Sequence, residues 1–348
     1  MKKKVGVFFN AGLGNSIVLV PLIKKLKREG NVDITAIFTD TFNADLLFSD
    51  QPNLIDHTII LRSNASVLKL LFKIKTFDLV FLDFFASTKK NLFIAKALSK
   101  EISAFKKEHI DPEFLNKRKD IHLVQATAQQ HTALVNLTLW PSLSQQLSIE
   151  DFQLKKPENN LQEKFKIREP YICVQVGSGN SRTPYKTWAP ENWKEIILHL
   201  TNHYATYQIV LIGDDSEKNI LDDFPSQKGI LNLLGKTSIE DLKSILSRAT
   251  LFIGHDSGPM HISVCYNVPT LTIWGGSSWH LYGYHNMAPK KHKIVGNKLD
   301  CWPCNAWINP NTKRVSDPLQ CPDFKCITHI STKQVIEVLD KTMKELND

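Results

Sequence analysis

Three short polar segments of the sequence stand where a predicted strand ends and a predicted helix begins, the position at which backbone N–H groups can bind an anion. The first covers residues 10–16, NAGLGNS, where Gly12 and Gly14 permit close approach of a ligand to the backbone. The third glycine of a dinucleotide-binding fingerprint is missing, because Ile17 stands in its place. A tight structural turn therefore explains this segment about as well as a phosphate site does.

The second segment covers residues 177–188, GSGNSRTPYKTW. It combines a flexible start with several hydroxyls and two cations, Arg182 and Lys186. Lysine supplies a point charge for an anion, and hydroxyls supply directional hydrogen bonds. These residue types suit an anionic ligand, and an ordinary polar surface loop is the equal alternative.

The third segment covers residues 254–261, GHDSGPMH, and has an apolar strand before it and a helix after it. Asp256 or Ser257 can cap that helix, and Gly258 exposes the backbone. A diphosphate here would meet several N–H groups and the positive end of the helix dipole. His261 lies about one turn into the helix, so its imidazole can point at the same ligand. A buried histidine of the core is the usual alternative, but the polar, glycine-rich surroundings favour a site.

Six cysteines are too few for a disulfide framework in a chain of this length. Cys173 and Cys265 lie in apolar runs and are expected in the core. The other four crowd into one segment with a spacing that can form a structural, non-catalytic four-thiolate zinc site: Cys301, Cys304, Cys321 and Cys326.

The elements that must position these segments alternate between strands and helices, which favours parallel βαβ units. In the first half we expect strands over 5–9, 34–39, 57–61 and 78–85, with helices over 17–27, 65–75 and 91–99. In the second half we expect strands over 171–177, 208–213, 250–254 and 270–275, with helices over 191–200, 239–247 and 331–346.

The stretch between Ser148 and Lys166 is polar and charged, and it reads as a linker. The fold class is therefore α/β, with two Rossmann-like, doubly wound parallel sheets. We expect one domain over 1–155, a second over 167–330, and a C-terminal helix over 331–348 that can pack back towards the first domain. Such pairs hold ligands in a cleft at the carboxyl ends of the strands.

Composition and charge restrict the class of protein further. The 348 residues are 42% hydrophobic and 22% charged, which is typical of a globular protein, and no run approaches the ~18 apolar residues of a membrane-spanning helix. The N-terminus resembles a signal peptide, but Asn10 and Gly12 interrupt its apolar run. We therefore expect a cytoplasmic protein.

The net charge of +8 is uneven, with +6 on residues 1–160 and +2 on residues 161–348. Much of the excess lies between Lys100 and Lys119. A solvated surface is the plain explanation, and an acidic partner such as a phosphorylated glycolipid, a membrane surface or a nucleic acid is the functional one. No nucleic-acid-binding motif supports the last partner.

Taken together, these segments resemble the ADP-heptose:lipopolysaccharide heptosyltransferase family, glycosyltransferase family 9. The resemblance is carried in the second half by residues 186–193, 233–261 and 269–278, which occur in the family's order and spacing. The first half is similar through residues 12–27, 77–83 and the region around His131.

The resemblance implies a GT-B architecture, in which the first domain binds the acceptor and the second binds the sugar nucleotide. It also implies an inverting, metal-independent transfer that requires no cofactor. By position, Lys186 would bind the donor phosphate, with Thr187 in the same loop, and Glu240 would bind the ribose. The diphosphate end would be lined by four residues of the third segment: Asp256, Ser257, Gly258 and His261.

One residue departs from the family's pattern. The position after Gly14 holds the expected general base of the family, an aspartate, and this sequence has Asn15 there. An amide does not accept a proton at neutral pH. We expect Asp83, at the end of a predicted strand, to substitute for it, with His131 as the second candidate.

The resemblance predicts transfer of a sugar, by default heptose from ADP-heptose or another nucleotide-diphospho-sugar, to an anionic glycolipid or oligosaccharide such as a lipopolysaccharide core. It places the protein in the cytoplasm, with peripheral association at the inner face of the membrane. Two alternatives stay open: a non-catalytic sugar-nucleotide-binding protein, which Asn15 would explain, and a nucleotide-sugar epimerase.

Overall fold

A computed structural model describes residues 2–39, 42–63, 75–107, 120–127, 130–158, 162–178, 183–221, 227–304 and 318–347. The chain divides into two compact units, Met1–Phe152 and Gln153–Asp348. Each unit contains one six-stranded sheet in which all the paired strands are parallel. The doubly wound α/β fold predicted from the sequence is confirmed.

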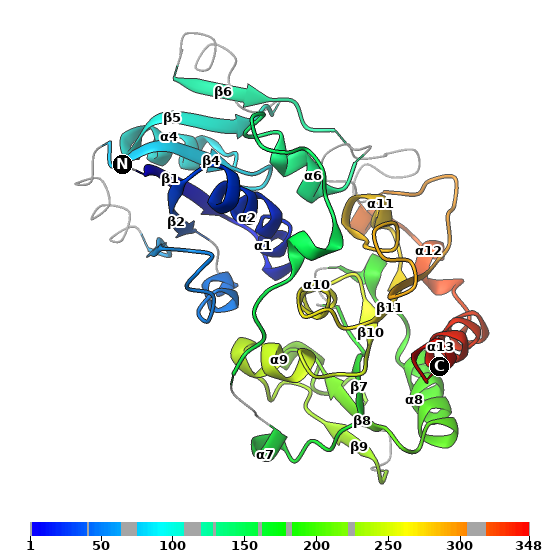
Figure 1. Cartoon of the computed structure of the whole chain (residues 1–348). Coiled ribbons are helices and arrows are strands. Elements are labelled where there is room, and N and C mark those ends of the chain that lie inside the picture. The colour runs from blue at the N-terminus through cyan, green and yellow to red at the C-terminus, as the bar shows by residue number, and fades with distance from the viewer. Residues whose placement is uncertain are drawn as a thin grey trace. The chain divides into compact units, whose positions relative to one another are not determined.

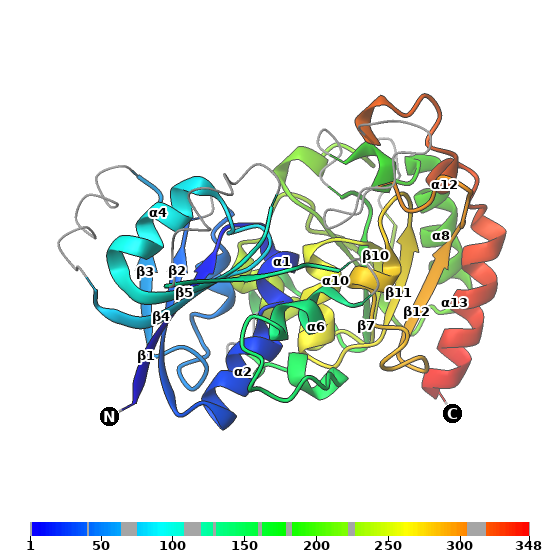
Figure 2. The same ribbon diagram turned by 90° about the horizontal axis from the view of Figure 1, so that it is seen from above.

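The first unit has the strand order β3-β2-β1-β4-β5-β6. Its strands are β1 (Lys3–Phe9), β2 (Val32–Phe38), β3 (His57–Ile60), β4 (Phe77–Leu82), β5 (Ser99–Phe105) and β6 (Ile121–Val124). The chain moves from β1 to β3 in one direction and from β4 to β6 in the other. Right-handed crossovers then place α2 (Val20–Glu29) and α4 (Lys89–Leu98) on opposite faces, as Figure 2 shows.

Strand β1 lies in the interior of the sheet, and both of its faces are apolar. Residues 5–9, VGVFF, are all buried, as expected for a parallel strand covered by helices on both sides. Gly6 has no side chain to place, and an added Cβ would lie 2.9 Å from Val80 on β4 and 3.2 Å from Ile37 on β2. The two neighbouring strands therefore pack directly over this glycine.

The helix expected over 17–27 is two helices, α1 (Leu13–Ile17) and α2. Pro21 is the second residue of α2 and has no N–H to continue a helix from the preceding turn. The helix therefore restarts at Val20, and the first polar segment ends in a separate short helix. Residues 65–74, where another helix is expected, lie outside the described residues, and Lys75 is in a turn.

The second unit has the order β12-β11-β10-β7-β8-β9. Its strands are β7 (Tyr171–Gln175), β8 (Gln208–Ile212), β9 (Ile230–Asn232), β10 (Leu251–His255), β11 (Thr270–Trp274) and β12 (His292–Gly296). Its helices include α8 (Pro190–His203), α9 (Ile239–Leu246), α10 (Gly258–Cys265) and α13 (Thr332–Asn347), and α9 packs beside α10 (Figure 1).

The C-terminal helix α13 has a buried stripe that includes Val335, Leu339 and Met343, spaced at four residues as on one face of a helix. This stripe joins the core of the second unit, where α13 packs on α8, β11 and β12. Figure 2 shows α8 and α13 side by side. The described packing of this helix is therefore on the second sheet.

Four strands were not predicted from the sequence: β5, β6, β9 and β12. They are edge strands or next to the edge, so polar residues alternate with apolar ones and the apolar runs are short. No helix among the described residues is long and apolar enough to span a bilayer.

The close packing over Gly6 generates a test of the first sheet. We expect Gly6→Ala to lower the free energy of unfolding by ~1–3 kcal/mol, because the added methyl overpacks the space beside Val80. Urea denaturation measures this loss. The double variant Gly6→Ala/Val80→Ala should lose less stability than the sum of the losses in the two single variants, since Val80→Ala removes the methyl groups that clash with the added one. Full additivity would show that Gly6 is not packed as described.

Candidate functional site

The carboxyl edge of the second sheet has a switch point between β7 and β10. These strands are neighbours, but the chain leaves β7 towards β8 and leaves β10 towards β11, on opposite sides. The loops that follow the two strands therefore diverge and leave room for a ligand between them. The second and third polar segments of the sequence follow these two strands.

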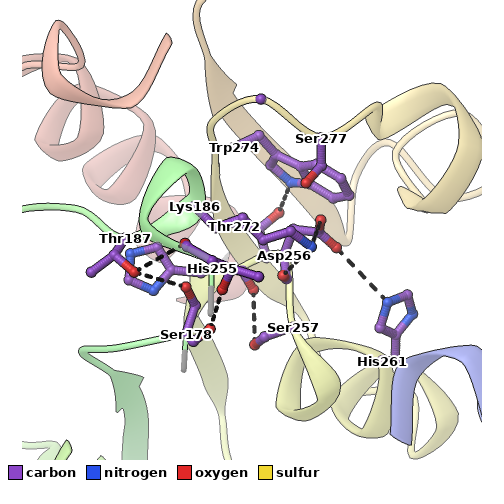
Figure 3. A network of polar contacts seen from close by, with 12 residues as sticks. Ser178, Lys186, Thr187, His255, Asp256, Ser257, His261, Thr272, Trp274 and Ser277 are labelled. Atoms are coloured by element: carbon purple, nitrogen blue, oxygen red, sulfur yellow. Dashed lines mark hydrogen bonds and ion pairs between the residues drawn. The ribbon is translucent and has the colours of Figure 1, made fainter. Parts of the chain in front are cut away.

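A buried ion pair joins the two segments. The Lys186 ammonium lies 2.7 Å from Oδ2 of Asp256 and 3.3 Å from its carbonyl oxygen (Figure 3). The side chains are 17% and 5% exposed. Burial alone raises the pKa of Asp256, but the Lys186 ammonium outweighs it and the net pKa lies below the ordinary value. The Asp256 carboxylate is therefore ionised, and the neighbouring ammonium balances its charge.

The loop that carries Lys186 is held at two further points. The Trp188 N–H donates to Nε2 of His255, a fully buried imidazole at the end of β10, over 3.0 Å. After β11, a Cβ on Gly275 would lie 1.9 Å from the Tyr185 carbonyl oxygen, so only glycine allows the loop to approach. Lys186 is thus fixed by backbone contacts on both sides of it.

Helix α10 presents its N-terminus to the same region. Ser257 is the N-cap residue, as predicted, but its hydroxyl donates to Oε1 of Gln175 over 2.5 Å and makes no capping bond. Gly258 is the first residue of the helix. The first N–H groups of a helix have no partner within it, and here no cap side chain takes their place. They are donors suited to an anion.

His261 projects from α10 towards Asp256, with Nε2 3.9 Å from Oδ1 (Figure 3). Burial lowers the pKa of His261 to about 4, although the Asp256 carboxylate partly opposes the shift. The imidazole is therefore neutral at physiological pH. Its Nδ1 lies 2.7 Å from the hydroxyl of Tyr284.

For the remaining residues of the predicted donor site, no direct contact with the Lys186–Asp256 pair is described. The Thr187 hydroxyl lies 3.1 Å from that of Ser178, so it bridges the start and end of the second segment. Glu240 is the second residue of α9 and is exposed, and no contact to Lys186 is described. Arg182 lies outside the described residues.

Three residues of this region were not selected from the sequence: His255, Gln175 and Tyr284. His255 stands inside the third segment, one residue beyond the strand expected over 250–254, and the structure makes it the last residue of β10. Gln175 and Tyr284 lie far away along the chain, and only the pairing of β7 with β10 and the loop after β11 bring them to the site.

The first unit repeats the switch point between β1 and β4. Asn10, after β1, donates from Nδ2 to the Phe85 carbonyl after β4 over 3.2 Å, and Thr39, after β2, donates to Oδ1 of Asn10 over 2.5 Å. Side chains thus tie together the carboxyl ends of three neighbouring strands.

The first polar segment follows β1. Gly12 is the N-cap of α1 with φ of −62°, and Gly14 and Asn15 are the second and third residues of that helix. Neither glycine is among the described residues with positive φ. These positions therefore do not require a left-handed backbone, and what glycine provides here is its small size. Asn15 is half-buried.

Asp83 directly follows β4 and is 3% exposed. One carboxyl oxygen accepts the Ala86 N–H over 2.6 Å. Burial raises the pKa of Asp83 to about 7, with the Ala86 N–H and the Lys107 ammonium opposing the shift. Lys107 is half-buried with its ammonium 4.3 Å from the centre of the Phe84 ring.

His131 is the N-cap residue of α6 (Thr132–Leu137), where its Nδ1 accepts the Ala133 N–H over 3.2 Å. Its ring packs edge-on against Phe152. In the structure His131 is therefore a helix cap.

The four clustered cysteines are free thiols that line one cavity of about 20 Å³ together with Tyr185 and Gly276. Burial raises the pKa of Cys326 to about 12, and the neighbouring thiols add to the shift. Four soft donors suit zinc or iron. However, among the described residues no three His, Cys, Asp or Glu side chains are grouped closely enough to hold a metal ion. The structure therefore lends no support to the zinc site, which stays a prediction.

A larger cavity of about 520 Å³ lies in the first unit, lined in part by Lys4, Asp33 and His57. These residues stand at the amino ends of their strands or beside them. The cavity is therefore at the opposite edge of the sheet from Asp83 and contributes nothing to the switch point.

Comparison with known sequences finds relatives that match either nearly the whole chain or part of it. Lipooligosaccharide heptosyltransferase 2 of Campylobacter jejuni is 22% identical, and the match covers 97% of this chain and 98% of that protein. Lipopolysaccharide heptosyltransferase 3 of Escherichia coli is 26% identical over 38% of this chain, a match that spans 42% of the E. coli protein.

Solved structures share the fold. A glycosyl transferase of family 9 from Veillonella parvula has a TM-score of 0.76 at 19% identity, covering 99% of this chain and 98% of its own. The E. coli ADP-heptose lipopolysaccharide heptosyltransferase II has a TM-score of 0.73 at 17% identity, with full coverage of both chains. The GT-B architecture is thereby confirmed. A UDP-N-acetylglucosamine 2-epimerase is less similar, with a TM-score of 0.52 at 12% identity.

The family model of glycosyltransferase family 9 (heptosyltransferase) matches residues 94–313, well over half of the sequence and including most of the second unit. The matched region contains Lys186, Asp256 and His261. With a full-length relative in C. jejuni and the GT-B fold, this match shows that the chain belongs to glycosyltransferase family 9, the heptosyltransferase family.

Proposed function

We propose that this glycosyltransferase transfers heptose from ADP-heptose to the core saccharide of a lipopolysaccharide or lipooligosaccharide, with inversion and without a catalytic metal ion. The observation that carries the proposal is the buried Lys186–Asp256 pair beside the N-terminus of α10, at the switch point of the second sheet. The donor follows from the relatives: one structure is an E. coli heptosyltransferase with ADP, and another holds ADP-2-deoxy-2-fluoro heptose.

The main task of the second unit would be to stabilise the departing diphosphate. The Lys186 ammonium supplies a charge-assisted hydrogen bond, and the first N–H groups of α10 supply neutral ones. Gly258 leaves these groups uncovered, and Ser257 and Thr187 place hydroxyls nearby. Glu240 is proposed to bind the ribose.

Asp256 has a different part in the proposal. It carries a negative charge, so it does not attract a diphosphate, but it fixes the ammonium where the two loops meet. Because the pair is neutral overall, recognition of the anion depends on aimed donors and not on net charge.

In the proposed mechanism these donors stabilise the negative charge of the leaving diphosphate, a task that a divalent cation can also perform. The transfer is therefore proposed to need no metal ion. TibC, an E. coli heptosyltransferase that is similar to this chain with a TM-score of 0.60, is described as iron-containing. If the four thiols bind a metal, we propose that its role is structural, and no step of the transfer uses it.

The acceptor hydroxyl needs a proton acceptor, which Asn15 does not provide. We propose Asp83 for this role, because its raised pKa, about 7, is matched to a general base near neutral pH. His131 is less suitable, since its Nδ1 already accepts a backbone N–H. The two candidates are separated by substitution.

The acceptor is proposed to be an anionic saccharide, in keeping with the basic first 160 residues and with the full-length lipooligosaccharide relative. Of the basic stretch, Lys100 pairs with Asp78, and residues 108–119 lie outside the described part of the chain. Action in the cytoplasm, at the inner face of the membrane, stays a prediction.

The direct test incubates the purified chain with ADP-heptose, with and without a lipooligosaccharide core acceptor, and follows ADP release. Release that requires the acceptor, with an inverted anomeric linkage in the product by NMR, supports the proposal. Binding without release would support the non-catalytic alternative, and a changed sugar on the nucleotide would support an epimerase.

Lys186→Ala tests the diphosphate site. We expect the Kd for ADP to rise about ten- to a hundredfold, because a charged hydrogen bond contributes ~1.5–3 kcal/mol. Isothermal titration calorimetry measures the change. Lys291→Ala is the matched control, since Lys291 is exposed and stands at the amino end of β12.

The alanine variant also leaves the Asp256 carboxylate buried without its cation. The double variant Lys186→Ala/Asp256→Asn removes that charge. If the double variant binds ADP as tightly as the wild type, Lys186 only neutralises Asp256 and does not contact the diphosphate.

Asp83→Asn tests the base. We expect turnover to fall by ~10²–10⁴ with ADP affinity unchanged, since the amide keeps the oxygen that accepts from Ala86 but takes no proton. If instead the wild type is almost inactive and Asn15→Asp restores turnover, no residue replaces the missing aspartate.

The same variant has a predicted effect on stability. The folded pKa is about 7 and the ordinary value 3.8, so between these values the folded carboxyl holds a proton that the unfolded one has lost. Wild-type stability from this group therefore falls as pH rises from 4 to 7, and Asp83→Asn should gain relative to it over that window, by a few kcal/mol at most. Asp78→Asn, on β4, should show the opposite sign in a lower window, because the Lys100 hydrogen bond lowers the pKa of Asp78. This variant should lose stability relative to the wild type as pH rises through the range just below pH 4, with no further change between pH 4 and 7.

A further inference from the structure

His261 has a second partner that the binding of the donor does not explain. The hydroxyl of Tyr284 lies 2.7 Å from Nδ1 of His261, and the rings meet edge to face with centroids 5.5 Å apart. Tyr284 follows α11 (Trp279–Tyr282), in the loop after β11, and is 2% exposed. The contact therefore joins the loop after β11 to helix α10 inside the second unit.

Neither member of this pair is charged at neutral pH. Burial lowers the pKa of His261 to about 4, and burial raises the pKa of Tyr284 well above its ordinary value. A neutral imidazole has one N–H, on Nδ1 or on Nε2, and the hydroxyl has one proton. The hydrogen bond thus has two forms: Tyr284 donates to Nδ1, or Nδ1–H donates to Tyr284.

The carboxylate of Asp256 decides between the two forms. Its Oδ1 lies 3.9 Å from Nε2 of His261, and the carboxylate is ionised because Lys186 is paired with it. An N–H on Nε2 is attracted to this oxygen, whereas a lone pair on Nε2 is repelled by it. The arrangement favours the form in which Tyr284 donates and Nε2 carries the proton.

We propose that Tyr284 is a positioning residue whose hydroxyl holds His261 in the Nε2–H tautomer, so that a neutral donor points to the place where Asp256 and Lys186 meet. Resting on the proposed function, this N–H is a further hydrogen-bond donor for the diphosphate of the sugar nucleotide. It adds a directed bond without adding charge to the neutral ion pair.

Tyr284→Phe removes the hydroxyl and keeps the ring. The ring also packs against His292, with centroids 5.9 Å apart, and phenylalanine preserves that contact. The matched control is Tyr282→Phe, which removes a hydroxyl from the neighbouring buried tyrosine of α11.

The test is ¹⁵N NMR of the full chain labelled at histidine, because the two ring nitrogens give separate signals in each tautomer. The signals of His261, one of 12 histidines, are assigned by their loss in His261→Gln. In the wild type we expect the Nε2–H tautomer, and in Tyr284→Phe a shift of population towards Nδ1–H. A wild type with Nδ1–H, or a Tyr284→Phe spectrum identical to that of the wild type, would overturn the proposal. The wild-type spectrum decides even if the variant does not fold.

ADP affinity separates this inference from the proposed function, because the NMR measurement needs no ligand. A lost neutral hydrogen bond corresponds to about a 2- to 10-fold rise in Kd for Tyr284→Phe, with Tyr282→Phe unchanged. If the tautomer changes as expected while ADP binding does not, Tyr284 positions His261 but His261 does not contact the diphosphate, and the donor site proposed above is wrong at this residue.

Discussion

A buried ion pair between Lys186 and Asp256 connects segments that are 70 residues apart in the chain. Removing a charge from water is costly, so such a pair persists only where the surrounding structure holds both partners in place. Here the surroundings are backbone contacts: the Trp188 N–H on His255, the Tyr185 carbonyl against Gly275, and the start of α10 directly after Asp256. The ion pair and these contacts together join the two loops at the carboxyl edge of the second sheet.

Because the Lys186–Asp256 pair has no net charge, it does not by itself attract an anion from a distance. A site with excess positive charge would bind a diphosphate through long-range attraction, whereas the proposed site would bind it through directed N–H donors: an ammonium, a helix start and a neutral imidazole. In the first unit the balance differs, since burial leaves Asp83 poised to take a proton near neutral pH. The carboxyl group of Asp83 and the Lys186–Asp256 pair thus lie at equivalent positions of similar sheets, each beside a switch point.

Much of this arrangement could be predicted from the sequence. Buried central strands such as β1, β7 and β10 have continuous apolar runs, and the polar segments after them led to the prediction that Lys186, Asp256 and His261 lie near one ligand. The structure brings the three side chains together. The strands β5, β6, β9 and β12, at the sheet edges or next to them, could not be predicted, because polar residues interrupt their apolar runs. His255 and Tyr284 were missed since their partners come from distant segments. Asp256 or Ser257 was expected to cap α10, but the Ser257 hydroxyl at the N-cap donates to Gln175 on the neighbouring strand and makes no capping bond.

A crystal structure of the chain with ADP tests the central claim most directly, because it locates the diphosphate relative to the ion pair. The account predicts phosphate oxygens within hydrogen-bonding distance of the Lys186 ammonium and of the first N–H groups of α10, with Nε2 of His261 facing them. ADP bound elsewhere, with Lys186 and Asp256 paired as they are here and no phosphate near α10, would contradict it.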